Sequence, residues 1–302
     1  MRPVFLTLDT ALDEQSVLRR QDGGLSIAAR DLGPALRLWS RPAALASLAA
    51  RLRDHVPGAG PELVFAGSGD FHHVTPLLIE RAMAAYGAGP VTVIHFDNHP
   101  DWVRFENGLH CGSWVGRAAR LPGVAKVITV GVCSGDIDRP ETKRADLDLV
   151  SGGRVELYPY RAPDGGPILR VGDQAWPSME AVGQDGFVDL LVSRIGTDAV
   201  YITIDKDVLR PDDAVTNWDQ GQLSLENLVR LVRAVAERAR LIGADVVGDW
   251  SPPRYGPDLL SSLLKRGEAF LDQPRGGVPG DMTRTNEATN LRLLSLFAEV
   301  TS

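Results

Sequence analysis

Short apolar runs rich in β-branched residues alternate along the chain with longer segments whose apolar residues recur at helical spacing. Runs of that length and composition are typical of strands buried on both faces of a parallel sheet. The pattern predicts strands over residues 3–8, 61–66, 91–97, 124–132, 154–158, 200–205 and 244–252, the last including an exit loop. It predicts helices that begin after residue 42 and over residues 75–86, 187–194, 225–241 and 287–297. The strand–helix–strand rhythm predicts an α/β fold with a parallel sheet.

One domain over residues 1–302 accounts for this pattern. The chain has 302 residues, 44% of them hydrophobic, which is enough for a large core. The stretch 272–280 is rich in glycine and proline, and we expect it to be a mobile surface loop and not a domain linker. Residues 139–187 show the weakest pattern of the chain.

Composition excludes several classes of protein. The net charge is −7 and the pI is near 5.4, with no basic run, so neither nucleic acid nor an anionic membrane is an expected partner. The first ten residues lack the apolar core of a signal peptide, and no stretch approaches the roughly 18–20 apolar residues of a membrane span. The two cysteines, Cys111 and Cys133, do not make a disulfide framework. We therefore expect a soluble, cytoplasmic protein.

Potential metal ligands follow two of the predicted strands. Asp97, His99 and Asp101 end the first strand at i, i+2 and i+4, and Asp205 and Asp207 end the second. Residues two apart on an extended chain point to the same side. Because open parallel sheets bind ligands at the carboxyl ends of their strands, we expect both clusters to face one site.

The charge of these side chains indicates which ligand the site takes. Four aspartates cannot be buried together as anions unless cations neutralise them. Two divalent ions would balance the four charges, and neutral His99 with one more histidine would complete the shell. Mixed imidazole and carboxylate ligands suit Mn²⁺ well, while Zn²⁺, Fe²⁺, Co²⁺ and Ni²⁺ stay open. By contrast, His95 within its apolar run is expected to be an ordinary core residue.

Three motifs resemble those of the ureohydrolases, the family of arginase and agmatinase. Asp97-Asn-His-Pro-Asp101 is similar to their Asp-Ala-His-x-Asp, and Asp205-Lys-Asp207 to their Asp-x-Asp with a following proline. Their Gly-Gly-Asp-His-Ser corresponds to Gly69-Asp-Phe-His72-His73, which carries an extra residue. Matching the Val-Thr that follows makes His72 the ligand, with His73 as the alternative. The resemblance spans roughly residues 62 to 252.

The resemblance implies an arginase-like, three-layer α/β/α fold with a mostly parallel central sheet and a binuclear Mn²⁺ centre. A water shared by the two ions would attack the guanidino carbon of a small guanidinium compound, and urea would be released. His110, in Asn107-Gly-Leu-His110, would be the catalytic proton shuttle, and Asp207 would orient the water. Asp138 and Asp249 would bind substrate, with Asp249 paired to the guanidinium. The family also implies a homo-oligomer, a trimer or a hexamer. The metal ligands implied are His72, Asp97, His99, Asp101, Asp205 and Asp207.

The sequence departs from the family where substrate would bind. The loop 102–110 is short and lacks the small polar residues that grip an α-amino acid, and Trp218 and Asp219 would give the pocket a different shape. Two other functions therefore stay open. One is hydrolysis of a formimino or acyl amide on the same fold, and the other is a metal-containing binding protein without turnover. Cys111, next to His110, is expected to be a bystander thiol because neighbours on an extended loop point apart.

Overall fold

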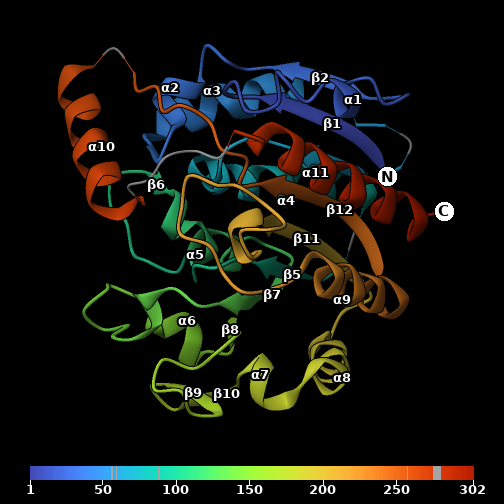
Figure 1. Cartoon of the computed structure of the whole chain (residues 1–302), viewed down its shortest axis with the longest axis vertical. Helices are drawn as coiled ribbons and strands as arrows, with labels where there is room; N and C mark the ends of the chain where they lie inside the picture. The colour runs from blue at the N-terminus through green and yellow to red at the C-terminus, as the bar shows by residue number, and fades with distance from the viewer. Residues whose placement is uncertain (56, 59, 88, 257, 275–279) are drawn as a thin grey trace.

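The structure is a computed structural model, which describes residues 1–302 except 56, 59, 88, 257 and 275–279. Its centre is an eight-stranded sheet in which all neighbouring strands run parallel (Figure 1). The strand order is β2-β1-β4-β12-β11-β5-β7-β8. The strands are β1 (Arg2–Thr7), β2 (Leu25–Ala28), β4 (Glu62–Phe65), β5 (Val91–Phe96), β7 (Val124–Val132), β8 (Val155–Pro159), β11 (Ala199–Asp205) and β12 (Arg240–Val247).

Helices cover both faces of this sheet and give the predicted three layers. On one face α4 packs against β12 and α5 against β7, and on the other α9 packs with α8 and α11 beside it (Figure 1). The α-helices are α1 (Ser16–Arg19), α2 (Gly33–Leu36), α3 (Pro42–Arg53), α4 (Thr75–Tyr86), α5 (Trp114–Ala119), α6 (Leu147–Ser151), α7 (Met179–Val182), α8 (Gln184–Arg194), α9 (Leu225–Arg238), α10 (Leu259–Asp272) and α11 (Met282–Glu299). Within the described residues no helix is long and apolar enough to cross a membrane.

Smaller elements complete the fold outside the central sheet. Two antiparallel pairs are β3 (Trp39–Ser40) with β6 (Leu109–His110), and β9 (Ile168–Val171) with β10 (Gln174–Pro177). Within the part of the chain that the structure describes, four 3₁₀ turns are η1 (Gly69–Val74), η2 (Cys111–Ser113), η3 (Gly135–Ile137) and η4 (Lys206–Val208). The chain ends meet, since the amino group of Met1 donates a hydrogen bond to Thr301 Oγ1 at 2.7 Å.

The middle of the sheet explains why the apolar runs were continuous. Every residue of β5 and β11 is buried, because helices cover both faces. The two strands are direct neighbours, with Val91 opposite Ala199 and Phe96 opposite Ile204. Their carboxyl ends therefore lie side by side at one edge of the sheet. Helix α9 shows the complementary pattern, because its buried residues recur every three or four positions.

Most predicted helices and strands are present. The bounds differ where the same apolar residues fit either the end of a helix or the start of a strand. Helix α4 has the predicted bounds, and Ser224 caps α9 by accepting a hydrogen bond from the Asn227 N–H. Helix α9 ends at Arg238, before the predicted Leu241, and β12 already begins at Arg240. The apolar residues after Arg238 fitted either element, and the extended backbone at Ala239 separates the two. The sequence did not predict α10, and most of the expected loop 272–280 lies outside the described residues.

Candidate metal centre

Three segments bring the predicted ligands to one edge of the sheet. The end of β5 carries Asp97, the end of β11 carries Asp205, and the turn η1 carries His72. All three side chains are almost completely buried. Because β5 and β11 are neighbours, the two acidic motifs meet as the spacing predicted.

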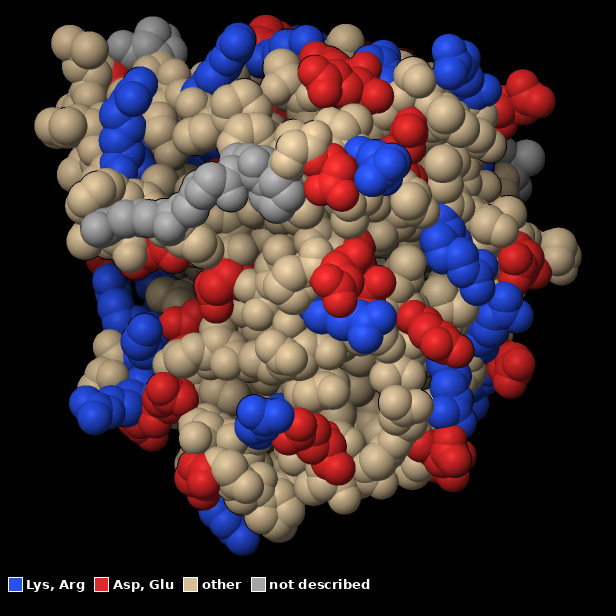
Figure 2. All heavy atoms as spheres, viewed as in Figure 1, with Lys and Arg blue, Asp and Glu red and all other residues tan. Residues whose placement is uncertain are grey.

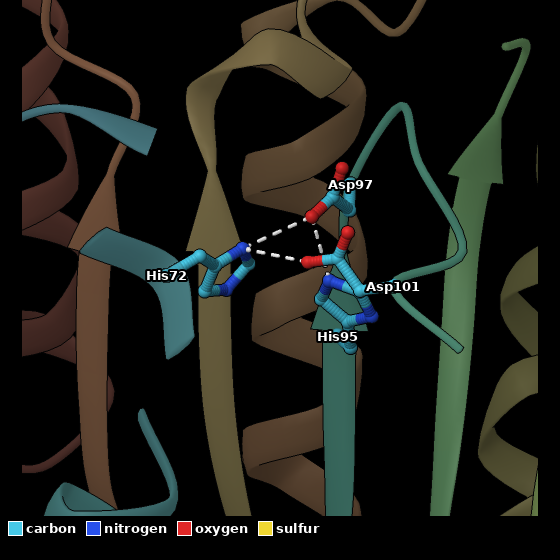
Figure 3. Close-up of side chains that lie close together, drawn as sticks. All are labelled: His72, His95, Asp97 and Asp101. Carbon is cyan, nitrogen blue, oxygen red and sulfur yellow. Dashed lines mark hydrogen bonds and ion pairs between the residues drawn. The ribbon is translucent and has the colours of Figure 1, made fainter. Parts of the chain in front are cut away.

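The first ligand group consists of His72, His95, Asp97 and Asp101 (Figure 3). His72 Nδ1 lies 3.0 Å from Asp97 Oδ2 and 3.4 Å from Asp101 Oδ2. The same nitrogen is 3.6 Å from Asp205 Oδ2. His95 approaches from below in β5, with its Nε2 2.8 Å from Asp97 Oδ2. Imidazole nitrogen and carboxylate oxygens thus converge on one point.

A buried relay fixes the orientation of the His72 ring. Thr203 Oγ1 donates to Asp245 Oδ1 at 2.9 Å, and His72 Nε2 lies 2.8 Å from the same hydroxyl. Since the hydroxyl has one proton, it accepts from His72 Nε2–H. A neutral His72 ring would therefore carry its proton on Nε2, which leaves the Nδ1 lone pair for a cation between this nitrogen and the carboxylates. This is the tautomer that binds a cation.

Asp101 is held by its backbone and by α5. Its φ of 48° lies in the left-handed region, which few non-glycine residues adopt and which aspartate tolerates better than most. Trp114 Nε1 donates to Asp101 Oδ2 at 2.6 Å, and the Val115 N–H donates to the Asp101 carbonyl. The first residues of α5 therefore keep this carboxylate beside His72.

The second ligand group consists of Asp97, His99 and Asp207. His99 Nδ1 lies 3.0 Å from Asp207 Oδ2 and 3.5 Å from Asp97 Oδ1. The other ring nitrogen of His99 is 2.9 Å from Asp219 Oδ1. Asp207 Oδ1 accepts from the Asn98 N–H at 3.0 Å. Asp97 belongs to both groups, with one oxygen directed at each.

Two glycines clear the space around Asp205. A Cβ on Gly69 would lie 2.5 Å from Asp205 Oδ2, and one on Gly248 would lie 2.4 Å from Asp205 Oδ1. Gly248 also has a φ of 93°, which side chains rarely adopt. Both approaches are closer than any non-bonded carbon tolerates, so the backbone must be glycine at these two positions. Asp205 can therefore reach the centre between the turn η1 and the end of β12.

Burial and mutual repulsion make these acids costly without cations. Burial, reinforced by the charge of Asp97, raises the pKa of Asp101 and of Asp207 to about 7. Burial raises the pKa of Asp205 well above its usual range, and Asp207 and Asp97 add to the effect. Burial alone would also raise the pKa of Asp97, but His95 and the other two histidines hold it well below its usual range. The cluster accordingly favours bound positive charge.

The geometry fits two metal ions. His72 Nδ1 is buried without a hydrogen-bond partner among the described residues, although it faces three carboxylates. Ligands bound at about 2.0–2.2 Å to one ion lie about 3 Å apart, which is the spacing found here. Two groups that share a carboxylate suit ions about 3.5–4 Å apart. Nitrogen and oxygen donors of this kind suit several divalent transition metals.

A cavity of about 600 Å³ opens above these ligands. Figure 2 shows a hollow below α10, with acidic and basic side chains around it. Trp218 and Asp219 line the cavity, as the sequence predicted, and Phe105 and Val103 contribute apolar wall. Asp205 also lines the cavity, and so do four acids that are not among the predicted ligands: Asp136, Asp219, Glu268 and Asp272.

His110 lies in the cavity wall and is held on both sides. The Gly112 N–H donates to its Nδ1 at 2.8 Å, which leaves the ring proton on Nε2. Nε2 makes a short hydrogen bond to Glu268 Oε1 of α10. Glu268 also accepts from Trp39 Nε1 at 3.1 Å. Cys111 is buried beside His110, and burial raises the pKa of its thiol, which agrees with a bystander role.

No family model matches the chain, but two curated proteins match part of it. An uncharacterized protein of Thermotoga maritima is 28% identical over 193 residues, which cover 64% of this chain and 60% of that protein. An arginase of Glycine max is 25% identical over 191 residues, which cover 62% of this chain and 46% of the arginase. The chain thus spans less than two thirds of the length of either relative.

Solved structures match almost the whole chain. An Entamoeba histolytica arginase in complex with L-ornithine superimposes with a TM-score of 0.62, with 12% identity and coverage of 98% of this chain and 97% of that one. The chain has the arginase fold. Proclavaminate amidino hydrolase of Streptomyces clavuligerus gives a TM-score of 0.60 at 17% identity, covering 99% and 92%. Formimidoylglutamase of Bacillus subtilis gives 0.58 at 15% identity, covering 100% and 87%. The predicted resemblance to the ureohydrolases is confirmed.

Within this arginase fold, the choice between the two adjacent histidines follows from their surroundings. His72 meets the carboxylates, whereas neither ring nitrogen of the buried His73 has a hydrogen-bond partner among the described residues. Burial holds the pKa of His73 well below its usual range. His95, expected to be a core residue, belongs to the first ligand group. His95 lies two residues before Asp97 on an extended chain, so the two side chains point to the same side, and this spacing was the signal that pointed to the site.

Asp249 does not reach the cavity, contrary to its expected role with a guanidinium. Its Oδ1 lies 2.8 Å from Lys206 Nζ and accepts from Gln15 Nε2 at 2.8 Å. Asn290 Nδ2 of α11 donates to its Oδ2 at 3.1 Å. The carboxylate is therefore fully engaged in a buried ion pair behind the site. The sequence did not predict this ion pair. Lys206 lies between the two predicted ligands Asp205 and Asp207, and nothing in that motif indicates that its side chain turns away from the site to meet Asp249.

Asp138 also lies outside the cavity. It is exposed just after η3, whereas Ser134, Gly135 and Asp136 line the cavity. Because the chain forms the short turn η3 here, Asp136 faces the cavity and Asp138 does not. The acid at the cavity wall is thus Asp136, two residues before the Asp138 that the resemblance implied.

Replacing His72 by Asn should reduce bound metal below two ions per chain, because the lone pair that faces three carboxylates is removed. Metal analysis of the purified protein measures this. The matched variant His73→Asn should keep its metal, although it is destabilised by disturbed packing. Equal metal contents in the two variants would contradict the assignment.

Replacing Asp249 by Ala should lower the free energy of unfolding by about 3–5 kcal/mol, because Lys206 is left as an unpaired buried charge. Denaturant unfolding measures the loss. The exposed Asp138→Ala should change stability by less than about 0.5 kcal/mol. A stable Asp249→Ala protein with a raised KM would instead restore the substrate-binding role.

Proposed function

We propose that this chain is a binuclear metal-dependent hydrolase that cleaves a C–N bond of a linear guanidinium compound and releases urea. The observation that supports this most is the pair of ligand groups that share Asp97 beneath an acidic cavity. Names of proteins with the same fold point to the same chemistry, since they include an arginase and an amidino hydrolase.

The ions would be held by His72, Asp97, His99, Asp101, Asp205 and Asp207, and Mn²⁺ is the metal we propose for them. His95 would act through Asp97, because its Nε2 lies 2.8 Å from Asp97 Oδ2. When bound, two such ions lower the pKa of a water and polarise the substrate. Asp207 is placed to orient that water, because its Oδ1 is fixed by the Asn98 N–H and its Oδ2 lies beside His99. Both contacts hold the carboxylate in one orientation before substrate arrives.

The charge of the cavity selects a cation as substrate. Eight of the described lining residues carry a carboxylate, while Lys143 is the one lysine among them and pairs with Asp136 at 3.2 Å. Two bound divalent ions would balance the four aspartate ligands, and the acids at the wall would still attract positive charge. The negative potential of the cavity would therefore attract a guanidinium compound. A formimino substrate that carries two carboxylates would be repelled by the same acids, so this form of the alternative is the weaker one.

His110 is the residue we propose as proton donor to the leaving amine. Its proton resides on Nε2, since Nδ1 accepts from the Gly112 N–H. Glu268 holds the ring so that this proton lies at the cavity wall. General acids placed in this way contribute about 10²–10⁴-fold to rate. The two thiols, both free, fit the cytoplasm, where we place the protein.

Metal-stripped protein should release no urea from a panel of guanidino compounds, and added Mn²⁺ should restore release from at least one. Colorimetric urea assay with metal analysis checks this. In the Asp97→Asn variant both metal and urea release should be lost, because this carboxylate serves both groups. Urea release that survives chelation would contradict the mechanism, and two bound ions without any turnover would favour the binding-protein alternative.

Replacing His110 by Asn should lower kcat about 10²–10⁴-fold at unchanged metal content, since the proton donor is removed but no ligand is. Steady-state kinetics on the compound found above measure the loss. The neighbouring Cys111→Ser serves as control and should keep most of the activity. A normal kcat in His110→Asn would exclude the proposed proton transfer.

A further inference from the structure

Helix α10 carries an unusual apolar surface. We call five of its residues the leucine face, and their exposed fractions run from 57% to 86%: Leu259, Leu260, Leu263, Leu264 and Leu271. Elsewhere in the described chain, large exposed hydrophobic side chains occur singly. A concentration of this kind marks a contact surface.

The opposite side of α10 holds the helix to the protein through polar contacts. Lys265 is its one buried residue among those described, with Nζ donating to the Ala35 carbonyl at 3.0 Å and lying over the Trp39 ring. Glu268 reaches His110 and Trp39 from the same side. A helix of 14 residues that buries so little is marginal on its own, because helices in proteins are stabilised mainly by packing of an apolar face.

The size of the leucine face matches one side of an interface. Five leucines exposed to this extent present roughly 600 Å² of apolar area, at the upper limit for a monomer and close to the ~800 Å² per partner of a standard interface. Covering the leucine face would stabilise α10 in the position where Glu268 meets His110.

The arrangement of the face suits a second copy of the same chain. Leu259 and Leu271 lie equally far on either side of residue 265, and so do Leu263 and Gly267. Two copies of α10 packed antiparallel about a two-fold axis would place Leu259 against Leu271 of the second copy. Leu263 would then face Gly267 of the second copy, which leaves open space beside it. The surface is thus complementary to itself.

Charge argues against a membrane as the occupant. Helices that lie on anionic membranes carry many lysines and arginines on their polar side. Helix α10 has one of each, Lys265 is buried, and Asp258 and Asp272 stand at the two ends of the helix. The chain as a whole has a net charge of −7. An anionic lipid surface would therefore repel it.

We propose that the leucine face of α10 is the contact between two copies of this chain, and that the contact holds Glu268 against His110. The contact itself is independent of the reaction. The consequence for His110 rests on the function proposed above, because it makes the proton donor depend on assembly.

Sedimentation velocity over a concentration series tests the contact. The wild type should sediment as a dimer or a larger oligomer, and Leu263→Glu should raise the dissociation constant of the α10 contact at least about tenfold, because a charge enters a buried apolar interface. Leu260→Lys is the second variant and should act in the same direction. Ile168→Glu, which changes an exposed hydrophobic residue on β9, is the matched control and should leave the dissociation constant unchanged.

Hydrogen–deuterium exchange reports on α10 without reference to activity. Amides of residues 259–272 should exchange several-fold faster in Leu263→Glu than in the wild type, while circular dichroism of the two proteins stays the same. A monomeric wild type, or an unchanged assembly in both variants, would overturn the proposal. Binding of the wild type to vesicles of phosphatidylglycerol, with loss of binding in Leu263→Glu, would overturn it in favour of a membrane. A weakened dimer with unchanged urea release would refute the link to His110 alone.

Discussion

The structure depends on four carboxylates buried at one edge of a parallel sheet. Asp97, Asp101, Asp205 and Asp207 are nearly inaccessible to solvent, and each raises the cost of ionising its neighbours. Only compensating positive charge makes such a cluster compatible with a stable fold. Two divalent ions would supply that charge, and the histidines around Asp97 hold the pKa of this carboxyl well below its usual range. The need to keep these acids together explains the other unusual features nearby.

Those features lie on several segments of the chain. Gly69 and Gly248 leave room for Asp205, and Asp101 occupies a left-handed backbone conformation beside Trp114. Thr203 and Asp245 fix which nitrogen of His72 faces the acids. Backbone strain and buried polar groups cost stability, and they gather at functional sites. Here each one positions a ligand.

Much of this could be predicted from local pattern. Buried parallel strands have continuous apolar runs, and side chains two residues apart share a face, so β5, β11 and their acidic ends were visible in the sequence. Tertiary pairing was not visible. The residues around Asp249 did not indicate its ion pair with Lys206. The residues around His110 did not indicate its hydrogen bond to Glu268, which lies far along the chain. His95 was assigned to the core because its apolar neighbours outweighed its parity with Asp97.

Helix α10 joins the interior of the site to the outer surface. One side of this helix places Glu268 at the wall of the cavity, and the other side exposes the leucine face. The short loop 102–110 leaves space on that flank of the cavity, with Phe105 and Val103 at its wall. Specificity in this molecule would therefore depend on a segment that lies outside the ligand motifs altogether.

Titration of metal-free protein with Mn²⁺, followed by thermal unfolding, tests the central claim most directly. Ions that bind the folded state alone raise Tm by an amount that grows with their affinity and their free concentration. The account predicts that Tm rises steeply until two equivalents are bound and only slowly, with the logarithm of free Mn²⁺, beyond that point, and that Asp97→Asn abolishes the steep rise. A Tm that does not respond to Mn²⁺ or to any other divalent transition metal would show that the buried acids are neutralised by protons and do not form a metal centre.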